Sequence, residues 1–186
     1  MKIYSILLGL LLLSISCTPV KLQTGITLQS LEGEVIAVDS AQQHRLTAYV
    51  FLAPACPLSE TYTQTINTLR EQYGKDVFFA GVIPGDLYST EEIIAFRDSF
   101  RVAFPIFPDP EKKLTHYLDA HITPEVFLLN SEGTLIYSGA IDNRAIELTR
   151  LRLSVTEPYL QDAIKLALNK QEIIIRKTQA VGCTIE

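Results

Sequence analysis

The 186-residue sequence lacks several features that mark common classes of protein. It contains no run of lysine and arginine, and 21 acidic residues outnumber 16 basic ones, which leaves a net charge of −5. Since a nucleic-acid surface needs clustered positive charge, no nucleic-acid partner is predicted. No glycine-rich loop follows a predicted strand, so we expect no flavin or nicotinamide, and no other cofactor. Repeats and low-complexity segments are absent as well, and the length suits one domain with a full hydrophobic core.

The N-terminus has the pattern of an export signal. Lys2 supplies a short positive start, residues 6–13 are densely apolar, and the small residues of Ser14-Ile15-Ser16 follow. The apolar stretch is too short for an ordinary membrane-spanning helix. We therefore predict that residues 1–16 form a signal peptide that is not part of the fold.

Cysteine is scarce, and the first of the three cysteines stands directly after this signal. The Ser16-Cys17 junction resembles a bacterial lipobox, in which the cysteine becomes the lipidated first residue of the mature chain. Ser14 stands where the lipobox usually has leucine, and cleavage by an ordinary secretory peptidase is the alternative. We expect lipid attachment at Cys17 and a tether over residues 17–24. The domain is then exported and held at a bacterial membrane, in the periplasm or at the cell exterior, where disulfides persist.

Cys56 is the strongest candidate for a functional residue. An apolar strand is predicted over residues 44–52, and apolar residues at three- and four-residue spacing predict a helix over Pro57–Tyr73. Proline suits the first helical position, so Cys56 is expected at the helix N-terminus. Unpaired N–H groups and the helix dipole favour thiolate there, which predicts a reactive and reachable thiol. The alternative is a small apolar side chain that fills a gap in the core.

The remaining pattern alternates strands and helices. Such an order, with a hairpin at each end of the strand series, predicts an α/β fold in which a mixed sheet carries helices on both faces. The domain is expected over residues 25–170. Its further elements are a hairpin of residues 26–31 and 34–38, a strand over 77–83, a helix capped by Ser89 or Thr90, a strand over 105–107, a short helix over 112–118, a hairpin of 126–129 and 134–137, and a helix over 158–169.

Three segments resemble the thioredoxin-like superfamily, and more narrowly its redoxin group, which includes the alkyl hydroperoxide reductase and thiol-specific antioxidant (AhpC/TSA) proteins and exported thiol–disulfide oxidoreductases. They are residues 51–60, residues 123–127 and residues 130–142. The resemblance implies a three-layer sandwich with an N-terminal hairpin extension. It also implies a cis Thr123-Pro124 bond that faces Cys56, with Thr123 pairing with a bound substrate chain. The partner would be a thiol or disulfide protein that serves as substrate or reductant.

The chain departs from these relatives at informative positions. Ser59 stands where thioredoxin-like oxidoreductases have the second cysteine of Cys-x-x-Cys. Its hydroxyl either hydrogen-bonds the thiolate, caps the helix or faces solvent, and the sequence leaves these open. Peroxiredoxins have a proline and a hydroxyl residue where this chain has Tyr49 and Ala53, so efficient peroxidase activity is not expected. His116 and His121 flank the predicted site, but with one thiol beside them no metal centre is predicted.

The third cysteine lies near the end of a tail that is expected to be flexible, over residues 171–186. At roughly 3.3 Å per residue the tail is long enough to cross a small domain. We predict that Cys183 acts as a resolving thiol for Cys56. The alternatives are an idle thiol on a mobile tail and a thiol paired with another chain. The favoured function is a membrane-tethered thiol–disulfide oxidoreductase with Cys56 as nucleophile. A slow thiol peroxidase and a non-catalytic binding module of the same fold remain as alternatives.

Overall fold

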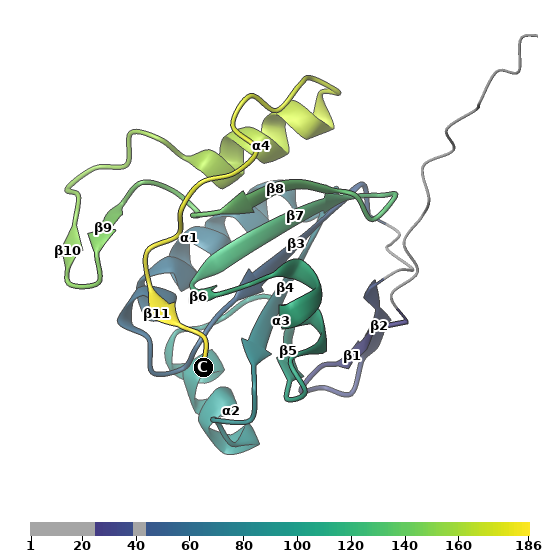
Figure 1. The fold of residues 1–186 in the computed structure, drawn as a ribbon, viewed down its shortest axis with the longest axis vertical. Coiled ribbons are helices and arrows are strands. Elements are labelled where there is room, and N and C mark those ends of the chain that lie inside the picture. The colour runs from purple at the N-terminus through teal and green to yellow at the C-terminus, as the bar shows by residue number, and fades with distance from the viewer. Residues whose placement is uncertain (1–24, 39–43) are drawn as a thin grey trace, which may run out of the picture.

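The central sheet has five strands in the order β5-β4-β3-β7-β8 in the computed structural model, which describes residues 25–38 and 44–186 (Figure 1). β3 (Leu46–Phe51), β4 (Val77–Pro84) and β5 (Ile106–Asp109) run parallel, while β7 (Glu125–Asn130) is antiparallel to β3 and β8 (Leu135–Gly139) is antiparallel to β7. The predicted mixed sheet is thus confirmed. The predicted signal peptide and tether lie outside the described residues.

Helices cover both faces of the sheet, as predicted. One hydrophobic cluster joins the sheet to α1 (Pro57–Tyr73), α2 (Thr90–Ser99) and α4 (Tyr159–Leu168). A second cluster on the other face contains α3 (Lys113–Leu118) and the hairpin of β1 (Thr27–Gln29) and β2 (Val35–Ala37). Every residue of β3 is buried, because this central strand is covered on both faces.

Ser89 is the residue that caps α2. Its hydroxyl accepts a hydrogen bond from the Glu92 N–H at 3.3 Å, and the Glu92 carboxylate accepts one from the Ser89 N–H at 2.8 Å. This reciprocal pair satisfies two N–H groups that the helix itself leaves unpaired. The open choice between Ser89 and Thr90 is therefore settled by side-chain geometry.

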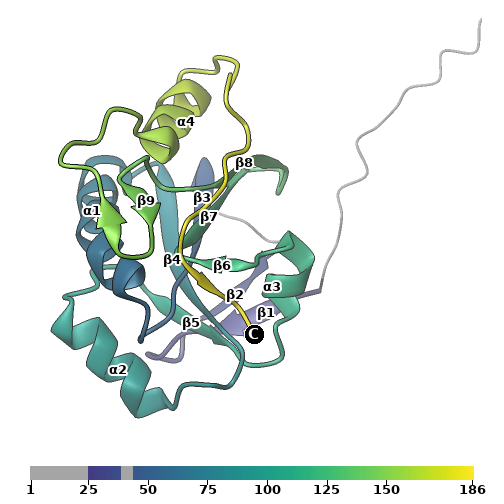
Figure 2. The same cartoon turned by 60° about the vertical axis from the view of Figure 1, so that its left-hand side comes forward.

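Three short strands and the course of the tail were not expected from the sequence. β9 (Ala145–Glu147) and β10 (Arg150–Leu151) form a hairpin before α4, and β6 (Ile122–Thr123) precedes Pro124. The expectation of a flexible tail is wrong. Figure 2 shows the tail passing along β8 and then beside β6, where β11 (Cys183–Thr184) pairs with β6.

The tail is fixed to the edge of β8 before it reaches β6. Ser138 donates its N–H to the Arg176 carbonyl at 3.0 Å, and Thr178 donates its N–H to the Ser138 carbonyl at 3.0 Å. The Thr178 hydroxyl lies 2.7 Å from the hydroxyl of buried Tyr137 and accepts the Ala140 N–H at 2.9 Å. The sequence did not predict these backbone and side-chain hydrogen bonds, because residues 171–178 have no strand periodicity.

The region after β8 contains a buried carboxylate. Asp142 is 5% exposed. It accepts hydrogen bonds from the Tyr62 hydroxyl at 2.7 Å and from the Arg144 N–H at 2.8 Å. Tyr62 on α1, distant in sequence, thus supplies a donor that makes burial of the carboxylate tolerable.

Within residues 25–38 and 44–186, none of the helices has the length and apolar character that crossing a membrane requires.

Candidate active site

Cys56 occupies the N-cap position of α1. Its backbone is extended, at φ −94° and ψ 114°, and its carbonyl accepts the Glu60 N–H at 3.2 Å. Pro57 follows as the first helical residue, as predicted. The turn in front is closed by the Cys56 N–H, which donates to the Ala53 carbonyl at 3.0 Å. The strand-turn-helix connection thus holds the sulfur over the N-terminal end of the helix.

The Ser59 side chain stabilises this turn and does not bind the sulfur. Ser59 is fully buried, and its hydroxyl accepts the Ala53 N–H at 3.1 Å. Its backbone N–H, however, is one of the donors that face the Cys56 sulfur. Of the roles that the sequence left open, solvent exposure is excluded. The contribution to the thiolate comes from the Ser59 main chain.

The Thr123-Pro124 peptide bond is cis and lies beside Cys56. The Cys56 thiol donates to the Thr123 carbonyl oxygen, with 3.1 Å between sulfur and oxygen. Thr123 is buried, and it is the last residue of β6. The structure therefore brings together Cys56, Thr123 and Pro124, which lie far apart in the sequence.

The tail occupies the edge that the sequence predicted as a docking site for a substrate chain. β11 pairs antiparallel with β6, so that Cys183 lies opposite Thr123. The Thr123 hydroxyl donates to the Cys183 carbonyl at 3.3 Å, and the Ile185 N–H donates to the His121 carbonyl at 2.8 Å. Cys56 and Cys183 are both free thiols, and Cys183 lies close enough to the Cys56 sulfur for its thiol to stabilise the Cys56 thiolate as a donor.

The expectation of a reachable Cys56 thiol is wrong for this arrangement. Cys56 is 1% exposed and belongs to the hydrophobic cluster against which Val181 and Cys183 of the tail pack. Cys183 itself is half-buried. A local sequence pattern places a thiol at a helix N-terminus, but it contains no information about a distant segment that covers it.

The environment shifts the pKa values of the two thiols in opposite directions. Burial acts to raise the pKa of Cys56. It is outweighed by hydrogen bonds from the Cys183 thiol and from the N–H groups of Ser59, Leu58 and Cys183, so that the pKa falls below its ordinary value. Burial, the hydrogen bond to Cys56 and repulsion by the Cys56 thiolate together raise the pKa of Cys183 to about 12. The Thr123 carbonyl is the partner of the protonated Cys56, since an oxygen lone pair repels a thiolate. The deprotonated sulfur relies on the Cys183 thiol and the three backbone N–H groups.

A pair of substitutions at Cys183 tests this hydrogen bond. Cys183→Ala removes the donor and is expected to raise the pKa of Cys56, whereas Cys183→Ser keeps a hydroxyl donor and leaves the pKa near its original value. The measurement is the pH dependence of Cys56 alkylation by iodoacetamide, with the site assigned by peptide mapping. The midpoint should move to higher pH only in the alanine variant. Equal midpoints in both variants would exclude the Cys183 thiol as a source of the lowered pKa.

Known structures of two exported proteins share this arrangement of strands and helices. One is the exposed lipoprotein thioredoxin of Streptococcus pneumoniae, at 15% identity and a TM-score of 0.57, over 78% of this chain and 98% of that chain. The other is a secreted disulfide oxidoreductase of Mycobacterium tuberculosis homologous to E. coli DsbE. It has 14% sequence identity and a TM-score of 0.57, over 80% of this chain and 97% of that chain. The fold is thioredoxin-like.

A third similar structure, that of an uncharacterised conserved protein from Geobacillus kaustophilus, has a TM-score of 0.77 at 20% identity, over 86% of this chain and 87% of that chain. No family model and no curated protein matches the sequence. At these identities the comparisons establish the fold. The narrower resemblance to AhpC/TSA proteins stays a prediction.

A cavity of about 400 Å³ opens beside the tail in this thioredoxin-like domain. Cys183 and Thr123 line it together with Tyr88, Leu87 and Lys112. Tyr88 lies close enough to both thiols that their charge, added to burial, raises the pKa of its hydroxyl. Sequence reasoning missed Tyr88, because a single tyrosine before a helix cap has no recognisable signal.

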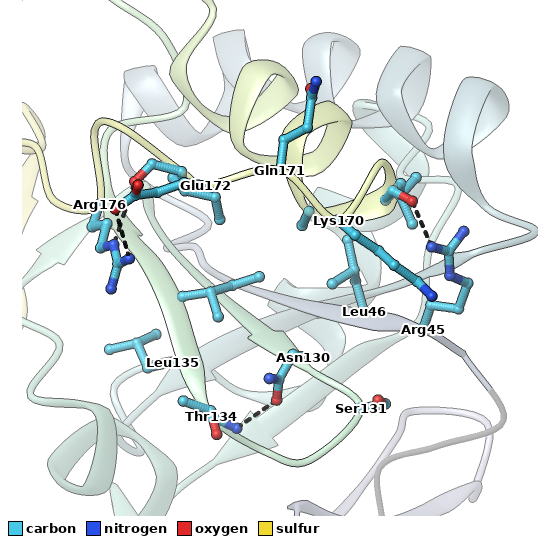
Figure 3. A pocket seen from close by; sticks show the side chains of 14 residues that line it. Arg45, Leu46, Asn130, Ser131, Thr134, Leu135, Lys170, Gln171, Glu172 and Arg176 are labelled. Atoms are coloured by element: carbon cyan, nitrogen blue, oxygen red, sulfur yellow. Dashed lines mark hydrogen bonds and ion pairs between the residues drawn. The ribbon is translucent and has the colours of Figure 1, made fainter.

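A second cavity, of about 430 Å³, lies at the opposite end of the sheet, where β3 begins and α4 ends (Figure 3). Two of its cations already have partners: Arg45 bonds Asp76 and the Leu168 carbonyl, and Arg176 bonds Glu172. The cavity contains neither of the thiols. It is not part of the candidate active site.

His116 and His121, which the sequence placed beside the site, belong to no ligand cluster in the described part of the chain. His121 pairs with Asp119 at 3.0 Å, and both side chains are exposed. The described part of the chain holds no group of three or more histidine, cysteine or acidic residues arranged to bind a metal ion.

Proposed function

We propose that this protein is a thiol–disulfide oxidoreductase in which Cys56 is the nucleophile and Cys183 is the resolving thiol. The observation that carries the proposal is the pair of neighbouring free thiols beside the cis proline, both next to Thr123, with the pKa of Cys56 lowered and that of Cys183 raised. A thiolate is the attacking species in disulfide exchange, so these shifts favour Cys56 for the first step.

In the first step the Cys56 thiolate attacks one sulfur of a disulfide in a partner protein. A bond forms between Cys56 and that sulfur, the disulfide of the partner breaks, and its second sulfur leaves as a thiolate that takes up a proton. In the second step the Cys183 thiolate attacks the Cys56 sulfur, which releases the second thiolate of the partner. The partner gains two electrons and the Cys56–Cys183 bond stores the oxidation. A dithiol protein reverses the sequence and regenerates both thiols.

The second step needs a deprotonated Cys183, and the first step makes this easier. Burial, the hydrogen bond to Cys56 and repulsion by the Cys56 thiolate hold the pKa of Cys183 at about 12. Once Cys56 carries a mixed disulfide, the negative charge and the hydrogen bond are gone. The pKa of Cys183 then falls, so the resolving thiolate forms only after the nucleophile has reacted.

The oxidoreductase works outside the cytoplasm in this proposal, held at a bacterial membrane by a lipid on Cys17. The apolar signal pattern and the Ser16-Cys17 junction support this location. Two structurally similar proteins are, respectively, secreted and an exposed lipoprotein. An oxidising compartment also allows a Cys56–Cys183 bridge to persist between encounters.

Oxidation of the full chain with Cys17→Ser tests the proposal, since Cys56 and Cys183 are then the only thiols. Treatment with an excess of oxidised glutathione should lower the intact mass by two hydrogen atoms and close one intramolecular bridge, with the two electrons passing to glutathione. The Cys183→Ser variant should show no such loss. An unchanged mass in the parent chain, or a disulfide-linked dimer, would contradict the assignment of Cys183 as the resolving thiol.

A further inference from the structure

The two thiols are arranged so that the reduced protein is closed to external disulfides. Cys56 has the lowered pKa but is 1% exposed, and the tail covers it. Cys183 is accessible from the cavity beside the tail, but it is the thiol whose pKa is raised. The reactive sulfur is inaccessible and the accessible sulfur is unreactive. Reaction with a partner therefore requires the end of the tail to leave β6.

Gly182 is the residue that allows the tail to occupy this edge. A Cβ atom at this position would lie 2.0 Å from the Thr123 carbonyl oxygen, 2.7 Å from the Thr123 carbonyl carbon and 2.9 Å from Ile122 Cγ2. The first two contacts are with backbone at the cis Thr123-Pro124 junction, which is fixed between β6 and β7 and cannot move aside. The requirement for glycine is one of space, since the side chain of any other residue would overlap the docking edge.

The tail can release its end without losing its anchor. Residues 176–178 stay bonded to the edge of β8, and Gly139 allows the close approach of Thr178, whose carbonyl oxygen would lie 2.1 Å from a Cβ at that position. Beyond Thr178, the backbone bonds and the pairing of β11 with β6 hold residues 183–185. The two hydrogen-bonded attachments are separate, and between them Ala180 is buried and Val181 packs against the core. When the segment from residue 179 onward swings away from its fixed base, it gives up this packing together with the pairing of β11.

We propose that the β6 edge selects for an extended strand in which glycine directly precedes cysteine, and that the chain's own tail occupies this edge as a built-in competitor until a partner strand of that kind replaces it. The inference rests on the proposed function for the identity of the partner, a protein whose Gly-Cys segment is exchanged at Cys56. The extended form of that segment, with glycine before cysteine, is taken from the way the tail itself lies on β6. In the register of the tail, the cysteine of the partner would lie opposite Thr123, next to the Cys56 sulfur.

The test measures how fast Cys56 reacts with a polyethylene-glycol maleimide in the reduced full chain. Cys17→Ser and Cys183→Ser make Cys56 the single thiol in every sample. Adding Gly182→Ala should speed labelling by at least about tenfold, because about 1.4 kcal/mol of lost docking free energy raises the open population tenfold. Thr184→Ala alters an exposed side chain of the same strand and should leave the rate unchanged. Equal rates for the two variants would overturn the closure by the tail.

Two synthetic peptides test the glycine requirement. A peptide of residues 179–186 with Cys183→Ser should slow the labelling of the Gly182→Ala chain back toward the parent rate, and the same peptide with Gly182→Ala should have no effect at equal concentration. Protection by both peptides would overturn the selection for glycine. If Gly182→Ala lowers the melting temperature, the labelling experiment uses instead a chain that ends at Thr178, which keeps the attachment to β8 and lacks the segment that covers Cys56. Labelling does not involve disulfide exchange, so a chain that behaves as expected here but forms no bridge on oxidation would refute the oxidoreductase and leave the docking inference intact.

Discussion

Cys56→Ser is expected to slow the reduction of a disulfide by roughly a thousandfold or more, which is the scale on which enzymes lose activity when the nucleophile is removed. A serine hydroxyl is not ionised at neutral pH and does not exchange with disulfides. Cys183 replaces it poorly: the repulsion and hydrogen bond from Cys56 are lost in this variant, but burial, the largest cause of the raised pKa of Cys183, remains. The measurement uses an aromatic disulfide that releases a coloured thiolate, with the full chain carrying Cys17→Ser. The parent chain should release two equivalents of thiolate for each molecule of protein.

The matched variant in this experiment is Cys183→Ser, which should release one equivalent and stop. Cys56 then carries a stable mixed disulfide that intact-mass analysis detects, because no second thiolate attacks it. Three patterns thus separate the roles: two equivalents in the parent, one in Cys183→Ser, and a slow background in Cys56→Ser. Two equivalents from Cys183→Ser, or rapid release from Cys56→Ser, would be incompatible with the assigned roles of the two cysteines.

A fast reaction of Cys56 with hydrogen peroxide would favour the thiol peroxidase that the sequence left as an alternative. In that reaction the Cys56 thiolate is oxidised to a sulfenic acid, and Cys183 condenses with it to give the same bridge and water. The chain offers Ala53 where a peroxidase would have a hydroxyl, and the Ala53 N–H is bonded to Ser59. If the rate with peroxide is close to that of a free thiol and disulfide exchange is fast, the oxidoreductase is favoured and the peroxidase is excluded.

The fold could be predicted largely from local signals. The helix that begins at Pro57 and ends at Tyr73 was predicted with the correct bounds, since a proline at its start and regular apolar spacing both mark it. The buried strand β4 was indicated by a continuous apolar run, which is typical of a strand covered on both faces. In each case, the signal lies within the element itself, and tertiary packing agrees with it.

The site could be predicted only in part, because its decisive contacts are long-range. The position of Cys56 at the helix N-terminus follows from its neighbours in sequence, and so does the resemblance that pointed to Thr123-Pro124. The course of the tail does not, since β11 has two residues and no periodicity. The pairing of Cys183 with Thr123, and with it the burial of Cys56, depends on a close approach at Gly182. A glycine near a chain end gives no indication of which backbone it will meet.

Tyr62→Phe is expected to reduce the free energy of unfolding by about 1.5–3 kcal/mol, the usual range for a hydrogen bond to a charged group. The Tyr62 hydroxyl donates to the buried Asp142 carboxylate at 2.7 Å and accepts the Ala145 N–H at 3.2 Å. Burial and Asp142 both raise the pKa of Tyr62, so the hydroxyl is the proton donor across the neutral range. Phenylalanine would leave the carboxylate with the Arg144 N–H alone and the Ala145 N–H without its acceptor. Urea unfolding measures the loss, and the melting temperature should fall by several degrees.

Tyr73→Phe is the matched control, because Tyr73 lies at the end of the same helix, is half-buried, and its hydroxyl has no partner among the described residues. It should change stability by less than about 0.5 kcal/mol. Asp142→Asn combined with Tyr62→Phe should recover part of the loss, since an amide left short of a donor costs less than a carboxylate. If the two tyrosine variants are equally stable, the hydrogen bond between α1 and the segment after β8 does not stabilise the fold. If the double variant is no better than Tyr62→Phe, the penalty comes from the Ala145 N–H and not from the buried charge.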